Sequence, residues 1–198
     1  DKEFISIIIR IADKKEHDPT IGGNVSEQRT TDQMHKLKKF IEKWISETGM
    51  KVLICHETRS TLETAKSYLW DILSEQARLN CVYMDHFWLP EQAYSILKRT
   101  RILVSQEMHS VIMAINAGTP IIHNPFAEAG RKRQMIRDMG LADWLVDMDE
   151  VSPDEMLNIA LSIHRDYSTA EQRIKELLPG LEIRAKATVN EIWTQWRA

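Results

Sequence analysis

The chain has 198 residues, a formal net charge of −3, and 43% hydrophobic and 28% charged residues. This balance is typical of a globular protein, and the length allows one domain with a sizeable core or at most two small ones. No basic stripe indicates nucleic-acid binding, no apolar run is long enough to span a membrane, and the first residues do not resemble a signal peptide. Because the chain opens with Asp1 and enters a predicted strand almost at once, we expect a domain excised from a longer protein.

The first half of the chain alternates strands and helices. A near-continuous apolar strand over 4–11 suits the centre of a sheet that is covered on both faces, and Arg10 stands at its carboxyl end. Residues 12–30 are polar and aperiodic, which predicts a loop. A helix then begins at Thr31 or Asp32 and runs to about residue 47, where Gly49 ends it. The remaining elements of this half are a strand over 51–55, a helix from Ser60 or Thr61 to about Arg78, a strand over 81–84, and a helix from Pro90 to about Leu97.

The two cysteines, Cys55 and Cys81, fall on predicted strands. Two cysteines do not make a disulfide framework, so we expect buried free thiols in a reducing compartment. The cytoplasm, or the inner face of the membrane, is the expected location.

The stretch 101–125 predicts a strand–helix–strand unit of a parallel sheet. Residues 102–104 form a short buried strand, and Ser105 is a plausible N-cap for the helix that follows. The apolar face of that helix recurs at helical spacing through Met108, Val111, Ile112 and Ile115. Gly118 can take a positive φ and end the helix, and the next strand opens at 120–122. Such a unit indicates parallel strands joined by a crossover helix.

The last third of the chain is mostly helical. We expect a basic helix over 130–139 ended by Gly140, a short strand over 144–146, a helix from Ser152 to about Arg165, and a final helical segment from 168 that is interrupted at Pro179. Because strands and helices alternate throughout, the predicted fold is α/β, a Rossmann-like, mostly parallel sheet with helices on both faces.

In such sheets, ligands bind beyond the carboxyl ends of the strands. Arg10 could bind a carboxylate or phosphate there, and His109, in the first turn of a helix, could contact an anion or act as general acid or base. Structural roles fit as well: a rim ion pair of Arg10 with Asp13 or Glu16, a core-edge His109, and a helix-start acid at Glu107. Further polar residues end neighbouring strands and form a candidate rim: His56, Glu57, Asp85, His123 and Asn124.

Several classes of chemistry lack their motif. No GxGxxG follows the first strand, which argues against a dinucleotide dehydrogenase, and Walker A, GxSxG and CxxC sequences do not occur. The histidines have no diagnostic ligand spacing, so we expect neither a metal nor a cofactor.

The stretch VSQEMHSVIMAINAGTPIIHNPF, with the later GRKRQMIRDMGLADWL, resembles the carboxyl-terminal half of the polysaccharide pyruvyl transferase family. That family has a strand, an S-x-R-[LM]-H motif, a small-residue helix, A-G-x-P, a second strand, a lysine region and a "glgdw"-like segment. The matching positions here are Ser105, Met108, His109, Ala117, Gly118, Pro120, Lys132, Gly140, Leu141, Asp143 and Trp144.

The resemblance implies one half of a two-domain, GT-B-like enzyme of bacterial exopolysaccharide and cell-envelope biosynthesis. Such an enzyme transfers a pyruvyl group from phosphoenolpyruvate, a co-substrate, to a sugar of a cell-surface polysaccharide. The implied catalytic residue is His109. The implied donor-binding residues are Arg10, Ser105, Glu107, Met108, Ser110, Arg131 and Lys132. A preceding amino-terminal domain would carry most of the glycan acceptor site, and the segment 168–198 would pack toward it.

One position departs from the family pattern, because Glu107 stands where the family has arginine. This change leaves three alternatives open. Another cation, such as Arg131 or Lys132, could compensate for the missing arginine. A GT-B glycosyltransferase could use a nucleotide sugar whose ribose hydroxyl is bound by Glu107, or the chain could be a non-catalytic sugar-binding domain that has lost its donor site. The donor, the acceptor sugar and the oligomeric state are not determined by the sequence.

Overall fold

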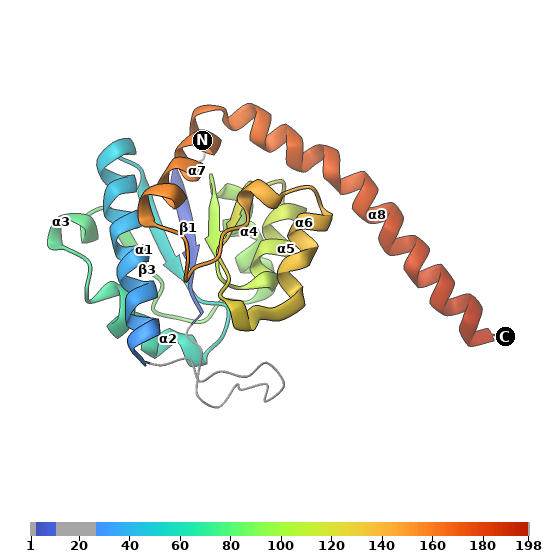
Figure 1. Cartoon of the computed structure of the whole chain (residues 1–198), viewed down its shortest axis with the longest axis horizontal. Helices are drawn as coiled ribbons and strands as arrows, with labels where there is room; N and C mark the ends of the chain where they lie inside the picture. Colours follow the sequence, from blue (N-terminus) through green and yellow to red (C-terminus); the bar gives the residue numbers. More distant parts are fainter. Residues whose placement is uncertain (1–2, 11–26, 198) are drawn as a thin grey trace.

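The computed structural model describes residues 3–10 and 27–197. Its centre is a five-stranded parallel sheet in the order β3-β2-β1-β4-β5 (Figure 1). The strands are β1 (Phe4–Ile8), β2 (Lys51–Cys55), β3 (Cys81–Tyr83), β4 (Leu103–Ser105) and β5 (Ile121–His123). The chain proceeds outward from β1 to β3 on one side and then returns to place β4 on the other side of β1. The strand order therefore reverses between β1 and β4, which is where ligands bind in open α/β sheets.

Helices join the strands and cover the sheet. They are α1 (Glu27–Thr48), α2 (Ser60–Ala65), the π-helix η1 (Lys66–Trp70), α3 (Glu75–Arg78), α4 (Pro90–Arg99), α5 (Met108–Asn116), the 3₁₀-helix η2 (Ala127–Arg133), α6 (Gln134–Asp138), the 3₁₀-helix η3 (Ala142–Trp144), α7 (Pro153–Arg165) and α8 (Tyr167–Arg197). Helix α1 packs on α7, and α4 packs on α5 on the opposite side of the sheet (Figure 1). None of these helices is long and apolar enough to cross a membrane within the described residues.

The predicted α/β fold is confirmed, with a core centred on the first strand. The isoleucines of the β1 segment, Ile5, Ile7, Ile8 and Ile9, are completely or almost completely buried. A central parallel strand has helices on both faces, so its side chains are apolar in both directions. The two cysteines are buried free thiols, as expected.

Two predicted helix starts and lengths were wrong. Helix α1 begins at Glu27, before Thr31 and Asp32, because its buried face already includes Thr30. The loop predicted over 12–30 was therefore wrong for 27–30, and its part over 12–26 lies outside the described residues. The single helix expected over 60–78 is three pieces. The amide of Asp71 bonds to the carbonyl of Lys66 in a π-turn, and Ser74 then caps α3 by accepting from the amide of Ala77.

The carboxyl-terminal third also differs from prediction. The strand expected over 144–146 is reduced to one bridge between Leu145 and His123, because η3 occupies the residues before it. The basic helix expected over 130–139 consists of the end of η2 followed by α6, and Gly130, at its expected start, has a non-helical backbone inside η2. Helix α8 continues through Pro179 without a break. Pro179 and Lys175 are exposed, so solvent can satisfy the Lys175 carbonyl that the proline leaves without a donor.

Three glycines end helices as predicted, and Gly118 offers the clearest test of that role. Its φ of +76° is a left-handed conformation, and a Cβ built there meets no atom within 4 Å. Gly118→Ala should therefore destabilise the fold by about 1–2 kcal/mol through backbone strain alone. Gly180 lies in α8 with equally open surroundings and no positive φ.

The matched control Gly180→Ala should have the opposite sign and stabilise by about 0.5–1 kcal/mol, because alanine is the better helix former. Urea unfolding of both variants measures the two effects. Equal effects of the two substitutions would contradict the conformational explanation.

Candidate functional site

A small cavity of about 190 Å³ lies at the carboxyl edge of the sheet, where the strand order reverses. The tips of β1 and β4 are tied together there, because the amide of Arg10 donates to Gln106 Oε1 at 2.9 Å. The cavity is lined by Arg10, Glu57, Thr58, Gln106, Glu107, Met108, His109, His123 and Lys132. The residues thus come from the ends of β1, β2, β4 and β5 and from the 3₁₀-helix that follows β5.

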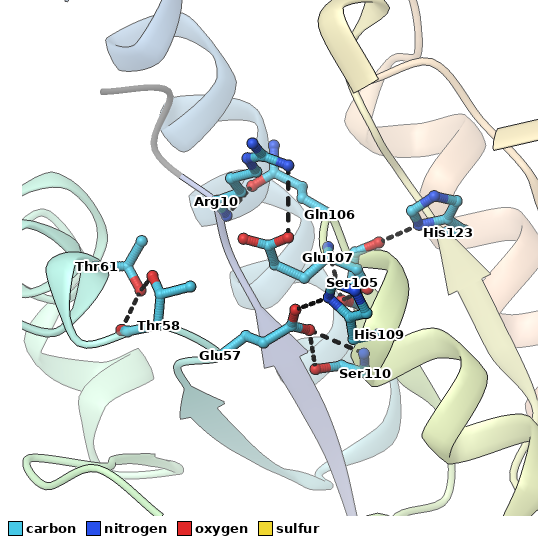
Figure 2. Close-up of polar contacts among 10 residues, drawn as sticks. All are labelled: Arg10, Glu57, Thr58, Thr61, Ser105, Gln106, Glu107, His109, Ser110 and His123. Atoms are coloured by element: carbon cyan, nitrogen blue, oxygen red, sulfur yellow. Dashed lines mark hydrogen bonds and ion pairs between the residues drawn. The ribbon is translucent and has the colours of Figure 1, made fainter. Parts of the chain in front are cut away.

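Arg10 and Glu107 form an ion pair across the gap between β1 and β4. Arg10 Nη1 lies 3.6 Å from Glu107 Oε2, and the Glu107 side chain is only 9% exposed (Figure 2). The guanidinium also lies over the ring of Phe126, 5.8 Å from its centroid. The glutamate at the position of the family arginine is therefore directly paired with a cation that faces the same cavity.

The amino terminus of α5 is capped by Glu57, not by Ser105. Glu57 Oε2 accepts from the amide of Ser110 at 2.8 Å and from its hydroxyl at 2.5 Å. Ser105 lies on β4, and its hydroxyl bonds to the backbone amide and carbonyl of Glu107, the N-cap residue. The carboxylate at the end of β2 thus occupies the anion position that the first turn of a helix offers.

The same carboxylate holds the imidazole of His109. Glu57 Oε1 lies 2.7 Å from His109 Nδ1 (Figure 2). A carboxylate only accepts, so Nδ1 carries the proton and Nε2 has the lone pair in the neutral ring. The His109 side chain is 76% exposed, which leaves Nε2 accessible to a reactant. This arrangement is a carboxylate–imidazole dyad, in which the carboxylate fixes the tautomer and the orientation of the ring.

His123 is a second imidazole at the cavity, and it is almost fully buried, with 1% exposure. Its Nδ1 lies 2.8 Å from the carbonyl oxygen of Ser105 (Figure 2). Burial lowers the pKa of His123 to about 4, an effect that the Ser105 carbonyl and the charge of Glu57 only partly offset. His123 is therefore neutral near pH 7.

The other predicted site residues separate into two groups. Met108 and Lys132 line the cavity, and Ser110 supports it through Glu57. The remaining residues do not line it. Arg131 is exposed, and Asp85 is exposed and bonds to its neighbour His86. His56 is buried and bonds through Nε2 to the carbonyl of Met84, and the amide group of Asn124 contacts the sulfurs of Met148 and Met156.

The role of Glu57 as both helix cap and histidine partner could not be found by sequence reasoning. Its partners, His109 and Ser110, lie more than 50 positions after Glu57 in the chain, and no short motif connects them to it. Within the described part of the chain, no three His, Cys, Asp or Glu side chains gather as metal ligands. The cavity instead offers two cations, two carboxylates and two imidazoles, which suits an anionic ligand that also carries hydrogen-bonding groups.

Comparison with known proteins identifies solved structures with a similar fold. No protein-family model and no curated protein matches the chain. Solved structures do match. The glycotransferase of kitacinnamycin is 14% identical with a TM-score of 0.58, over 96% of this chain and 43% of that one. The α,α-trehalose-phosphate synthase (UDP-forming) of Burkholderia vietnamiensis is 10% identical with a TM-score of 0.58, over 97% and 44%. The UDP-GlcNAc 2-epimerase of Methanocaldococcus jannaschii is 10% identical with a TM-score of 0.56, over 81% and 38%.

These likenesses establish the fold as one Rossmann-like half of the GT-B type. The chain spans less than half the length of each of these structures. The identities of 10–14% carry information about the fold only.

The buried His123 makes the stability of the protein dependent on pH. The unfolded chain takes up a proton at this ring below pH 6.5, whereas the folded chain does so only near pH 4. The contribution of His123 to the free energy of unfolding should therefore be constant above pH 7. It should fall by up to about 3 kcal/mol as the pH decreases from 6.5 to 4. His123→Gln should lose this component, so its stability relative to wild type should improve as the pH falls. Urea titrations between pH 4.5 and 7.5 measure it, and a wild-type curve that stays parallel to the variant curve would contradict it.

Proposed function

We propose that the chain is the donor-binding half of a two-domain transferase that moves a pyruvyl group from phosphoenolpyruvate to a sugar of a cell-surface polysaccharide. The observation that carries the proposal is the Glu57–His109 dyad on one small cavity together with two cations, Arg10 and Lys132, from separate elements. The sequence resemblance on the same stretch supports it, because its catalytic histidine corresponds to His109.

The size and charge of the cavity favour a small donor. A volume of about 190 Å³ suits a three-carbon phosphate better than a whole nucleotide sugar. Arginine can bind a carboxylate or a phosphate with two parallel hydrogen bonds, and lysine supplies a compact second charge. Arg10 is already paired with Glu107, so the donor has to compete with this carboxylate for the guanidinium.

The dyad supplies the proton that the reaction requires. His109, protonated at Nε2 and oriented by Glu57, gives a proton to C3 of phosphoenolpyruvate while an acceptor hydroxyl attacks C2. A second hydroxyl of the same sugar then displaces phosphate at C2 and closes the ketal. The two hydroxyl protons end on C3, by way of His109, and on the departing phosphate, so atoms and charge balance.

The acceptor is proposed to reach the dyad from a large groove. This groove of about 1110 Å³ lies between α4, α5 and α8, and His109 borders both the groove and the small cavity. The outer half of α8 continues past the groove and carries exposed apolar residues, among them Val189, Ile192, Trp193 and Trp196. We assign this face to the amino-terminal domain, which would form the second wall of the cleft.

A nucleotide-sugar-dependent glycosyltransferase is the second candidate. Two of the similar structures are named for UDP chemistry, and the buried carboxylate of Glu107 could accept from a ribose hydroxyl. A third candidate, a non-catalytic sugar-binding domain, draws on the Arg10–Glu107 pair, which neutralises a donor-binding cation.

Calorimetric titration with phosphoenolpyruvate tests the donor assignment. Arg10→Gln and Lys132→Gln should each weaken binding about tenfold or more, because each removes a charged hydrogen-bond donor from the cavity. Arg131→Gln is the matched control, since Arg131 is adjacent to Lys132 and does not line the cavity, and it should leave the affinity unchanged. Equal effects at 131 and 132 would indicate a non-specific basic surface.

Glu107→Gln distinguishes the three candidates. If phosphoenolpyruvate is the donor, removing the competing carboxylate should raise its affinity several-fold. If a nucleotide sugar is the donor, the variant should lose saturation-transfer NMR signals from UDP-glucose. An unchanged, negligible response to both ligands would favour the non-catalytic domain and would argue against pyruvyl transfer.

A further inference from the structure

His123 presents a lone pair that no residue of the described chain satisfies. Its Nδ1 lies 2.8 Å from the Ser105 carbonyl oxygen, which can only accept, so Nδ1 carries the hydrogen. Nε2 is therefore an acceptor in the neutral ring. This atom is buried and has no hydrogen-bond partner among residues 3–10 and 27–197. A buried acceptor without a donor costs free energy, and such groups in native proteins require an explanation.

The position of His123 supplies that explanation. The ring lines the same small cavity as Arg10 and Lys132, which attract an anion. A bare carboxylate or phosphate oxygen would be repelled by the lone pair of Nε2 as well as by the Glu107 carboxylate. A hydroxyl fits both demands, because it donates to Nε2 while its oxygen accepts from a neighbouring cation.

We propose that His123 is a binding residue for a ligand hydroxyl, which lies beside the anion held by Arg10 and Lys132 and donates to Nε2. The inference rests on the proposed function in so far as the cavity is the reaction site. In pyruvyl transfer, this hydroxyl belongs to the acceptor sugar that attacks the donor. In nucleotide-sugar transfer, it belongs to the donor itself.

A pair of small acids that differ by one hydroxyl tests the inference. 2-Phosphoglycerate and 2-phospholactate share a carboxylate and a phosphate on the same carbon, and only the former has a hydroxyl on C3. The wild-type chain should bind 2-phosphoglycerate roughly three- to tenfold more tightly, the range expected for one neutral hydrogen bond. In nitrogen-detected NMR spectra, the Nε2 resonance of His123 should move upfield with 2-phosphoglycerate and stay in place with 2-phospholactate.

Two substitutions at the same position separate ligand binding from structural support. His123→Asn keeps a donor near the place of Nδ1, toward Ser105, and removes the acceptor at the place of Nε2. It should abolish the preference for 2-phosphoglycerate. His123→Gln can place its amide oxygen near the position of Nε2 and should retain part of the preference. Circular dichroism and urea unfolding establish that both variants are folded.

The remaining outcomes are assigned as follows. If UDP-glucose moves the His123 resonance and neither small acid binds, the hydroxyl proposal stands and pyruvyl transfer fails. If both small acids bind with equal affinity, or His123→Asn weakens both equally, His123 has only a structural role and the proposal is overturned. If no probe moves the resonance, the cavity does not bind a ligand hydroxyl and the proposal is likewise overturned.

Discussion

The rest of the site depends on the hydrogen bonds that the Glu57 carboxylate accepts from the start of α5. This carboxylate joins the end of β2 to the first turn of α5 by accepting from the amide and hydroxyl of Ser110 and from His109. One group therefore caps a helix, fixes the tautomer of an imidazole and closes one side of the cavity. Helix caps are ordinarily local, contributed by the residue just before the helix. Here the cap comes from the end of β2, which β1 separates from β4, so the geometry of the site is coupled directly to the packing of the sheet.

The cavity has balanced charges. Arg10 faces Glu107, Glu57 faces the amino terminus of α5, and Lys132 adds a cation from the segment after β5. Low local dielectric strengthens each of these interactions and makes each unpaired group costly. A ligand that enters this cavity therefore exchanges partners with groups that are already bonded. This favours ligands that bring both an anion and a hydrogen-bond donor over simple anions.

Much of the fold could be predicted from the sequence, because its signals are local. The isoleucine run of β1, the helical spacing from Met108 to Ile115, and Gly118 each determine structure within a few residues. The errors occur where a contact from a distant residue, or the exposure of the site in the folded chain, determines the local structure. Serine is a favoured N-cap residue and Ser105 lies just before α5, yet Glu57 provides the cap from the end of β2. Proline ordinarily breaks a helix, yet α8 continues through Pro179, which is exposed to solvent.

For the site, the sequence likewise indicated where polar residues gather but not which way their side chains point. Topology alone indicated that polar residues after parallel strands would meet at one edge, and Arg10, Glu57, His109 and His123 do line one cavity there. Side-chain direction could not be read from the sequence. His56 and Asn124 end strands in the same way, but they turn toward Met84 and toward the sulfurs of Met148 and Met156.

The continuity of α8 has a mechanical consequence. At about 1.5 Å per residue, its 31 residues form a rod about 46 Å long. Leu178 and Leu181, near its middle, form part of the groove beside His109. Trp193 and Trp196 belong to its carboxyl-terminal end, which projects away from the sheet (Figure 1). Since a straight helix resists bending, a force applied at the tryptophans is transmitted as a tilt at the leucines. If the helix moves as one body, a displacement at the tryptophans would change the width of the groove beside His109, with the helix acting as a lever.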